Sequence, residues 1–344
     1  MHYLITGHTG FKGAWLTLML TQQGHEVSGL SLDPEPGSLY EVGAVGELVQ
    51  LDIRGDIRSA DTVRAALEAT SPDAVYHLAA QPLVRESYRD PRTTVETNVI
   101  GTYNVVEAIS AVPSVQASVI ITTDKVYRNV NQIQGYVESD PLGGHDPYSA
   151  SKAMADILTQ SWMLSFPDTP MAIARAGNVI GGGDVCQDRL MPDLMRGFSE
   201  GTEVSLRSPE AVRPWQHVLD CLTGYQLLMQ ELLVGNPNAR EQPTWNFGPG
   251  PANFRTVGEV ADLASKMWGS PTSWSVPPQT HPHEAELLAL DATAARQKLA
   301  WADRLDFSQA IEWTVEWTKS VNAGADPRAT TTAQIEQYVA LVSQ

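Results

Sequence analysis

The sequence is short of cysteine, positive charge and long hydrophobic runs, and each shortage excludes a class of protein. Two cysteines among 344 residues cannot form a disulfide framework, and they lack the spacing of metal ligands. Lysine and arginine number 23 against 40 aspartates and glutamates, and the net charge of −17 argues against binding to nucleic acid or acidic membranes. No apolar run reaches the roughly 18 residues of a membrane span, and the first residues lack a signal-peptide pattern. We therefore expect a cytoplasmic protein without a metal site.

The sequence does contain an alternation of strand-like and helix-like segments. Short apolar runs typical of buried strands occupy residues 3–5, 27–32, 74–78, 118–122 and 171–175, and helical patterns occupy 14–23, 62–69, 94–109, 149–163 and 218–233. This order predicts an α/β fold, a doubly wound parallel (Rossmann) sheet with a smaller, irregular C-terminal lobe. We expect residues 1–176 and about 216–243 to form the sheet domain. Residues 177–215 and about 244–344 would then form a substrate-binding lobe.

A glycine-rich turn separates the first expected strand from the first expected helix. Gly7, Gly10 and Gly13 are spaced as Gly-x-x-Gly-x-x-Gly. Residues without a Cβ allow backbone N–H groups and a helix N-terminus to reach a pyrophosphate. An ordinary glycine-rich turn is the alternative, but the position at the head of a strand–helix–strand pattern favours a dinucleotide site.

The residue that would hold a ribose hydroxyl is expected near the end of the second strand. Ser31 occupies the tip of that strand, and Asp33 lies two residues beyond it. An acidic residue in this place favours NAD over NADP. Asp56 and Ile57, after the third strand, are candidates for contact with the adenine, although a solvated surface aspartate is the alternative.

Two groups of residues carry the chemistry of acids and bases. Tyr148 and Lys152 lie four residues apart at the start of an expected helix, and therefore on one face of it. A nearby ammonium lowers the pKa of a phenol, so this tyrosine could act as a base toward a sugar hydroxyl. Asp124 and Lys125 follow an apolar strand at its carboxyl end, where open parallel sheets bind ligands. They form either a salt-bridged loop or part of an active site.

Taken in order, these segments resemble the extended short-chain dehydrogenase/reductase superfamily, and within it the nucleotide-sugar 4,6-dehydratases. The lysine of Thr123-Asp124-Lys125 resembles the branch that acts on CDP-glucose. The resemblance covers almost the whole chain. Its stretches are GHTGFKGAWL (7–16), HLAAQPLV (77–84), TNVIGT (97–102), DPLGGHDPYSASK (140–152), ARAGNVIGGGD (174–184), DRLMPD (188–193), RPWQHV (213–218) and WNFGP (245–249).

The resemblance implies both a reaction and a set of residues for it. Tyr148, helped by Lys152 and positioned by Thr123, would take the proton of the sugar 4-hydroxyl while hydride passes to NAD. Lys125 would then remove the C5 proton, and Asp124 would protonate the departing C6 hydroxyl. Lys125 must therefore be partly neutral, and Asp124 needs a raised pKa. The product would be a 4-keto-6-deoxy sugar.

The resemblance also implies which residues bind the two ligands. The cofactor would be held by Gly7, Thr9, Gly10, Phe11, Lys12, Gly13, Asp56, Ile57, Leu78, Ala79, Ala80, Asn98, Tyr148 and Lys152. Substrate would be held by Asn178, Arg189, Arg213, Gln81 and Asn246, because arginine suits a diphosphate. The helices at 94–109 and 149–163 resemble those of a dimer interface, so a homodimer is expected.

Departures from the family pattern leave the substrate open. Asn131-Gln132-Ile133-Gln134 and Val137 replace an aromatic segment, and Asp184-Val185-Cys186 replaces Asp-Trp. The nucleotide base, or the sugar, could therefore differ from CDP-glucose. A nucleotide-sugar 4-epimerase is an alternative that needs no Asp124–Lys125 pair. A catalytically silent nucleotide-binding protein is a second alternative.

Overall fold

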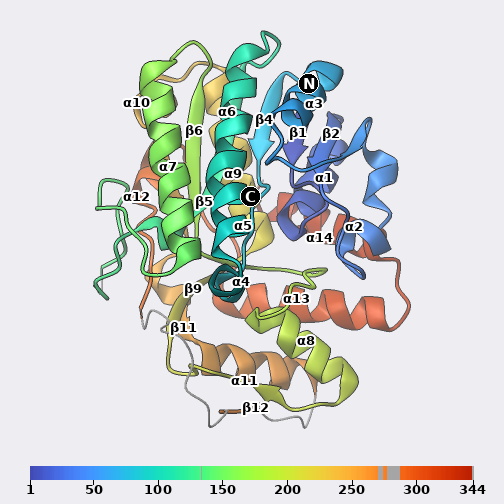
Figure 1. Cartoon of the computed structure of the whole chain (residues 1–344). Coiled ribbons are helices and arrows are strands. Elements are labelled where there is room, and N and C mark those ends of the chain that lie inside the picture. Colours follow the sequence, from blue (N-terminus) through green and yellow to red (C-terminus); the bar gives the residue numbers. More distant parts are fainter. Residues whose placement is uncertain (133, 270–273, 277–286, 343–344) are drawn as a thin grey trace.

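A seven-stranded parallel sheet forms the centre of the molecule (Figure 1). The structure is a computed structural model, and it describes residues 1–132, 134–269, 274–276 and 287–342. The strand order is β10-β6-β5-β4-β1-β2-β3, and each neighbouring pair is parallel. The strands are β1 (His2–Thr6), β2 (Glu26–Ser31), β3 (Asp52–Arg54), β4 (Ala74–His77), β5 (Ala117–Thr123), β6 (Met171–Ala176) and β10 (Thr244–Phe247). The order reverses beside β1, as a doubly wound sheet requires.

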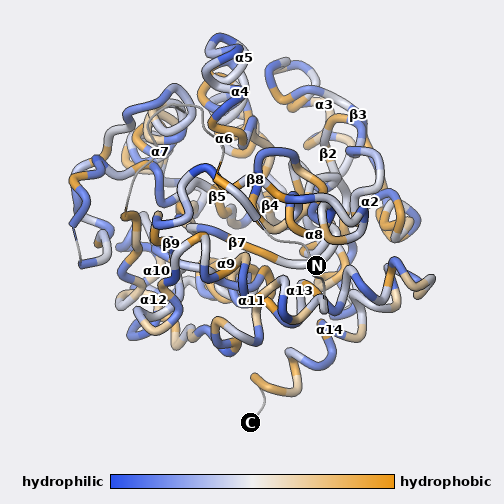
Figure 2. Tube along the Cα trace, turned by 90° about the horizontal axis from the view of Figure 1, so that it is seen from below, coloured by the Kyte–Doolittle hydropathy of each residue, from blue (hydrophilic) through white to orange (hydrophobic). Residues whose placement is uncertain are grey.

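Helices cover both faces of this sheet, which explains why its strands are nearly continuous apolar runs. Along β1, Tyr3 and Ile5 pack in one core with α1 (Phe11–Gln22) and α9 (Val218–Leu233). Leu4, between them, packs in a second core with α3 (Ala60–Thr70) and α6 (Thr102–Ala111). Figure 2 shows α3 and α6 on one side of the sheet and α9 on the other. The doubly wound α/β prediction is confirmed.

The helix predicted at residues 94–109 is built from three parts. It consists of α5 (Pro91–Val95), the π-helical turn η2 (Glu96–Gly101) and α6. It begins earlier than predicted because the Asp90 side chain accepts a hydrogen bond from the Thr93 N–H, and Pro91 suits the first turn. The short helix α4 (Val84–Arg89) precedes it, and α7 (Pro147–Ser165) packs beside it.

A second group of elements lies beyond the carboxyl ends of the strands, at the bottom of Figure 1. Helices α8, α11 and α13 share an apolar core there with Trp215 of β9. The elements of this group are β7 (Asn178–Ile180), α8 (Leu190–Glu200), β8 (Val204–Ser205), β9 (Val212–His217), β11 (Phe254–Thr256), α11 (Val257–Trp268), β12 (Trp274–Ser275) and α13 (Phe307–Asn322).

The predicted lobe boundary near residue 244 does not follow the strands. β10 pairs with β6 in the central sheet, and α14 (Pro327–Val342) contacts α1 and α2 (Leu39–Val42). The remaining short elements are η1 (Val45–Leu48), η3 (Asp124–Val126), α10 (Pro237–Glu241), η4 (Pro251–Asn253) and α12 (Thr293–Lys298). The division of the chain into two domains stays a prediction, and residues 270–273, 277–286 and 343–344 of the expected lobe lie outside the described residues.

A buried ion pair joins α7 to the sheet. Arg175 of β6 donates from Nη2 to Asp156 Oδ1 at 2.7 Å and from Nε to Oδ2 at 2.9 Å. The two side chains are 1% and 0% exposed. Thr122 Oγ1 of β5 also donates to Asp156 at 3.0 Å, and Arg175 Nη1 donates to the Tyr127 hydroxyl at 2.8 Å. The charges are therefore fully hydrogen-bonded, which a buried pair requires.

None of the helices in the described ranges combines the length and apolar character needed to cross a lipid bilayer.

Removing one member of the buried pair should destabilise the protein strongly. In Asp156→Asn the guanidinium of Arg175 stays buried without its counter-charge, and we expect a loss of about 3–5 kcal/mol in the free energy of unfolding. The measurement is urea unfolding followed by circular dichroism. The matched control is Glu96→Gln, which breaks the exposed Arg92–Glu96 pair and should cost less than about 1 kcal/mol. Equal losses in the two variants would contradict the role given to the buried pair.

Candidate active site

A cavity of about 680 Å³ lies at the carboxyl ends of the strands, between the sheet and the second group of elements. This is where a doubly wound sheet binds its ligands, and the volume is within the range of small-molecule sites. Most residues predicted for cofactor and substrate line it together. They are Gly7, Thr9, Gly10, Phe11, Lys12, Gly13, Asp56, Ile57, Leu78, Ala79, Ala80, Gln81, Thr123, Asp124, Lys125, Tyr148, Lys152, Asn178, Arg189 and Arg213.

The glycine turn between β1 and α1 is a cradle that side chains would fill. A Cβ on Gly7 would lie 2.7 Å from the backbone nitrogen of Ala79, and one on Gly13 would lie 2.2 Å from the Gly7 carbonyl oxygen. Gly7 also has a φ of +78°, which L residues rarely adopt. Gly10 caps α1 without a side-chain hydrogen bond, and the first turn holds no acidic residue. The N-terminus of α1 is thus suited to a phosphate.

Polar groups at the end of β2 extend this cradle. Thr9 Oγ1 lies 2.7 Å from Ser31 Oγ and donates to the Leu32 carbonyl at 3.1 Å, and so ties the turn to β2. Ser31 and Asp33 both line the cavity, and the Asp33 side chain is 91% exposed. In the turn after the neighbouring strand β3, Asp56 pairs with Arg58 at 2.6 Å, and that hydrogen bond lowers the pKa of Asp56. The acidic carboxylates face the place where a ribose and an adenine would follow the pyrophosphate.

Thr123, Asp124 and Lys125 form the turn at the end of β5. Thr123 Oγ1 donates to Asp124 Oδ1 at 2.9 Å, and the Lys125 N–H reaches the same hydroxyl at 3.4 Å. Asp124 is 2% exposed, and its Oδ2 has no hydrogen-bond partner among the residues that the structure describes. Burial raises the pKa of this carboxyl, although Lys125, the Thr123 hydroxyl and Arg213 act in the opposite direction. The raised pKa is the direction that a proton donor needs.

Tyr148 and Lys152 lie on one face of α7, beside this turn. Burial raises the pKa of Tyr148 to about 12, and the hydrogen bond with Thr123 and the charge of Arg189 lower it only in part. The net pKa of the phenol is therefore raised and not lowered as expected, because burial outweighs the positive charges near it. The Lys152 amino group donates to the Ile121 carbonyl at 2.9 Å, and burial lowers its own pKa to about 8.

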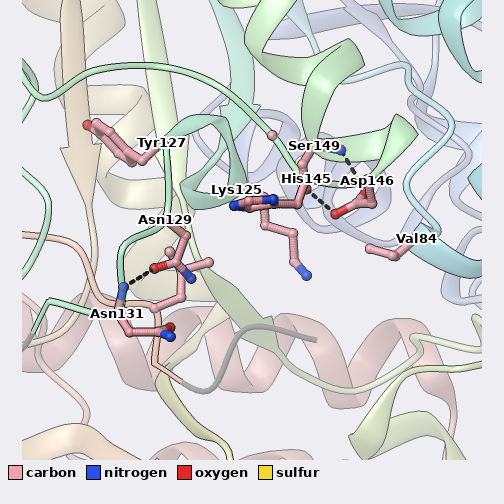
Figure 3. A pocket seen from close by; sticks show the side chains of 10 residues that line it. Val84, Lys125, Tyr127, Asn129, Asn131, His145, Asp146 and Ser149 are labelled. Atoms are coloured by element: carbon pink, nitrogen blue, oxygen red, sulfur yellow. Dashed lines mark hydrogen bonds between the residues drawn. The ribbon is translucent and has the colours of Figure 1, made fainter. Parts of the chain in front are cut away.

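Lys125 also borders a second, smaller cavity of about 70 Å³. Figure 3 shows its side chain extending into the space between Asn129 and Val84. His145 and Asp146, just before α7, lie on another side of this space. Asp146 caps α7 by accepting from the Ser149 N–H at 2.9 Å. Lys125 therefore lines both the large cavity and this smaller, polar one.

Positive groups gather at the large cavity although the chain is acidic. Arg189 Nη1 lies 3.3 Å from Asp184, at the beginning of α8. Arg213 of β9 is 7% exposed, and its positive charge acts to lower the pKa of Asp124. Asn178, at the start of β7, lines the same wall. These three residues are placed as an anion site requires.

Two predicted ligand residues do not line the cavity. The Asn98 side chain donates from Nδ2 to the Gln81 carbonyl and to Ser151 Oγ, and its Oδ1 accepts from the Gln81 N–H at 2.8 Å. Asn246 is fully buried in β10, where it bonds the Tyr127 hydroxyl and the carbonyls of Tyr136 and Asp291. Both amides bond other groups of the protein, and their assignment as ligand residues stays a prediction.

Three further residues of the cavity were not predicted from the sequence. Arg85, Asp188 and Arg207 line it, and both arginines pair with Asp188. The available signal was an arginine directly after the HLAAQPLV stretch and another directly before Ser208-Pro209. The two segments that differ from the family pattern also line these cavities. Asn131 lines the smaller cavity, and Asp184 and Cys186 line the larger one. Ile133, in the first of these segments, lies outside the described residues.

Within the described ranges, no cluster of three or more histidine, cysteine, aspartate or glutamate side chains is arranged to hold a metal ion.

Comparison with known proteins finds relatives that align with nearly the whole chain. CDP-glucose 4,6-dehydratase of Salmonella typhimurium is 40% identical over 349 aligned residues, 99% of this chain and 96% of that protein. The crystal structure of dTDP-glucose 4,6-dehydratase from Streptomyces venezuelae, with NAD and TYD bound, superposes with a TM-score of 0.81 at 24% identity and covers 95% of this chain and all of that one. UDP-glucuronic acid 4-epimerase from Bacillus cereus gives a TM-score of 0.81 at 23% identity and covers 93% of this chain and all of that one.

The model of the family described as GDP-mannose 4,6 dehydratase matches residues 4–314. That span includes the glycine turn, the Thr123–Lys125 turn, the Tyr148–Lys152 pair and the arginines of the cavity. The chain therefore belongs to the GDP-mannose 4,6 dehydratase family.

Proposed function

We propose that this protein is an NAD-dependent nucleotide-sugar 4,6-dehydratase that converts CDP-glucose to CDP-4-keto-6-deoxyglucose. The observation that carries the proposal is the buried Asp124, which has a raised pKa and stands next to Lys125 on the same cavity as Tyr148. A redox enzyme that acts only at C4 needs the tyrosine but has no use for this pair. The 40% identity to a CDP-glucose 4,6-dehydratase supports the same reading.

NAD fits the cradle at the head of α1. The pyrophosphate would lie on Gly7, Gly10 and Gly13, where added Cβ atoms at Gly7 and Gly13 would collide with backbone atoms. Ser31 and Asp33 would receive the adenosine ribose hydroxyls. Bound NAD⁺ would supply a hydride acceptor, which returns the same hydride later, and a positive charge beside the phenol that favours its ionised form.

The first task of the chain is to remove the proton of the sugar 4-hydroxyl. Tyr148 would accept it, and Thr123 would hold the phenol in place through its hydrogen bond. The raised pKa of Tyr148 makes the phenolate scarce in the free protein but a strong base once formed. Lys152, with a pKa of about 8, retains positive charge at neutral pH and so favours the phenolate through space.

The second task is to eliminate water across C5 and C6. The 4-ketone makes the C5 hydrogen acidic, and Lys125 would take that proton as the C5–H electron pair forms the C5–C6 double bond. The C6–O bond breaks, and Asp124 gives its proton to the departing oxygen, which leaves as water. A proton then returns to C5 from Lys125 as C6 is reduced. Tyr148 releases the proton that it took from the 4-hydroxyl, and Asp124 takes one up again, both by exchange with solvent, so atoms and charges balance over the cycle.

Binding of the substrate relies on the positive wall of the cavity. Arg189 and Arg213 would hold the diphosphate, and the Asn178 amide would donate a further hydrogen bond. Cys186, in a segment that departs from the family pattern, also lies on this cavity, as does the neighbouring Asp184. A base or sugar other than those of CDP-glucose would therefore be selected here.

We propose that two copies of the chain associate through α6 and α7, and that the protein works in the cytoplasm. The two helices lie side by side and carry exposed apolar residues. Ile100, in the π-helical turn η2 that leads into α6, is 48% exposed, and Met154 and Ile157 of α7 are 42% and 53% exposed. A second copy that covers this face would remove the apolar side chains from water.

Incubation with NAD⁺ and nucleotide sugars tests the reaction and the base together. We expect mass spectrometry to show loss of one water from CDP-glucose and little change in dTDP-, UDP- or GDP-glucose. Loss of water from another nucleotide sugar would keep the reaction and reject the base. Interconversion of C4 isomers without a mass change would reject the dehydratase in favour of the epimerase.

Lys125→Ala tests the elimination step. Without its base the variant should still oxidise C4, so the absorbance of NADH should appear, while water loss falls by about 10²–10⁴-fold. Lys266→Ala, which removes an exposed lysine of α11, serves as the matched control and should behave like the wild type. Normal dehydration by Lys125→Ala would exclude Lys125 as the base.

A further inference from the structure

Arg85, Asp188 and Arg207 form an ion-pair triad on the wall of the large cavity. Asp188 Oδ1 lies 3.1 Å from Arg85 Nη1 and 3.4 Å from Arg207 Nη1. Arg207 Nη2 also lies 3.5 Å from the Asp188 carbonyl oxygen. The three side chains are 31%, 29% and 22% exposed, so solvent and ligands reach them from the cavity.

The members of this triad come from opposite sides of the cavity. Arg85 belongs to α4, which follows β4 of the central sheet. Asp188 precedes α8, and Arg207 follows β8, both in the second group of elements. The Asp188 carboxylate therefore connects the two sides of the cavity through Arg85.

The backbone of Asp188 is held in an unusual conformation. Its φ of +60° lies in the left-handed region, which aspartate tolerates better than most residues but which still costs energy. Such conformations persist where the surroundings impose them, and they are common at ligand sites. The carboxylate carried by this backbone lies between the two guanidinium groups.

The triad brings two positive groups to one negative group. Its two guanidinium groups share one carboxylate oxygen. A single carboxylate engages each arginine through one nitrogen, whereas guanidinium groups bind phosphate through two parallel hydrogen bonds. A diphosphate, with more charge and more acceptor oxygens, is therefore the better partner for both arginines.

We propose that Arg85 and Arg207 are ligands for the diphosphate of the nucleotide substrate, and that Asp188 occupies their guanidinium groups until the substrate displaces it. This assignment deepens the proposed function, on which the identity of the ligand rests. It adds a contact from the sheet side of the cavity to those of Arg189 and Arg213 on the other side. The arriving diphosphate then links both sides, as Asp188 does before it.

Titration calorimetry of the full-length protein saturated with NAD⁺ tests the proposal, with CDP as the probe. Arg85→Gln and Arg207→Gln should each weaken CDP binding by about tenfold or more, while the affinities for cytidine and NAD⁺ stay within about twofold. The matched control is Arg89→Gln, on the same helix, whose partner is Glu86 and which does not line the cavity. It should bind CDP like the wild type.

The variant Asp188→Asn distinguishes a carboxylate that competes with the diphosphate from one that maintains the shape of the cavity. If the carboxylate competes with the diphosphate, this variant should bind CDP as tightly as the wild type or more tightly. CDP binding weakened as much as in Arg85→Gln would overturn the proposal, because the ion pairs of the triad would then serve to maintain the shape of the cavity. Unchanged CDP binding in both arginine variants would also overturn it.

The result also distinguishes the two proposals. If the wild type dehydrates a nucleotide sugar but Arg85→Gln binds the corresponding nucleoside diphosphate normally, only the role of the triad fails. If the wild type binds none of CDP, dTDP, UDP or GDP, the proposed function and the triad assignment fail together.

Discussion

The placement of α7 depends on the ion pair between Asp156 and Arg175. Tyr148, Lys152 and Asp156 are spaced four residues apart, so they form one row along a single face of the helix. The last member of this row is locked to β5 and β6 by Thr122 and Arg175. A rotation of α7 that moved Tyr148 away from Thr123 would have to break a fully buried, hydrogen-bonded charge pair. The tyrosine, the lysine and the turn after β5 are therefore fixed relative to one another by a residue outside the cavity.

The sequence predicted well those features that are encoded locally. The glycine turn, the Tyr148–Lys152 spacing and the apolar strands each depend on neighbouring residues, and the parallel topology then brings their ends together. The protein partners of Asn98 and Asn246 were not predicted, because the partners of an amide cannot be read from its neighbours in the sequence. Asn246 bonds groups 110 and 45 residues away in the chain. The pKa of Tyr148 was missed for a similar reason, since burial outweighs the charges named by the motif.

The charge of the chain is distributed to suit an anionic ligand. Although the net charge is −17, Arg85, Arg189, Arg207 and Arg213 all line the large cavity. Arg85, Arg189 and Arg207 are paired with a carboxylate of the protein, Asp184 or Asp188. Such pairing limits the repulsion among the cations before a ligand arrives. The surplus of acidic residues elsewhere keeps the molecule highly charged, which favours solubility.

The pairing of β10 with β6 has a consequence for the way the chain folds as it is synthesised. The edge of the central sheet is supplied by residues 244–247, after β7, α8 and β9 have already been made. The layer that covers α1 is completed later still, when Arg328 of α14 donates to the Gly43 and Ala44 carbonyls. Contacts of such long sequence separation form slowly. A nascent chain that ends at residue 176 therefore exposes an unpaired sheet edge on the ribosome, and this stage is the one at which chaperones and aggregation compete for it.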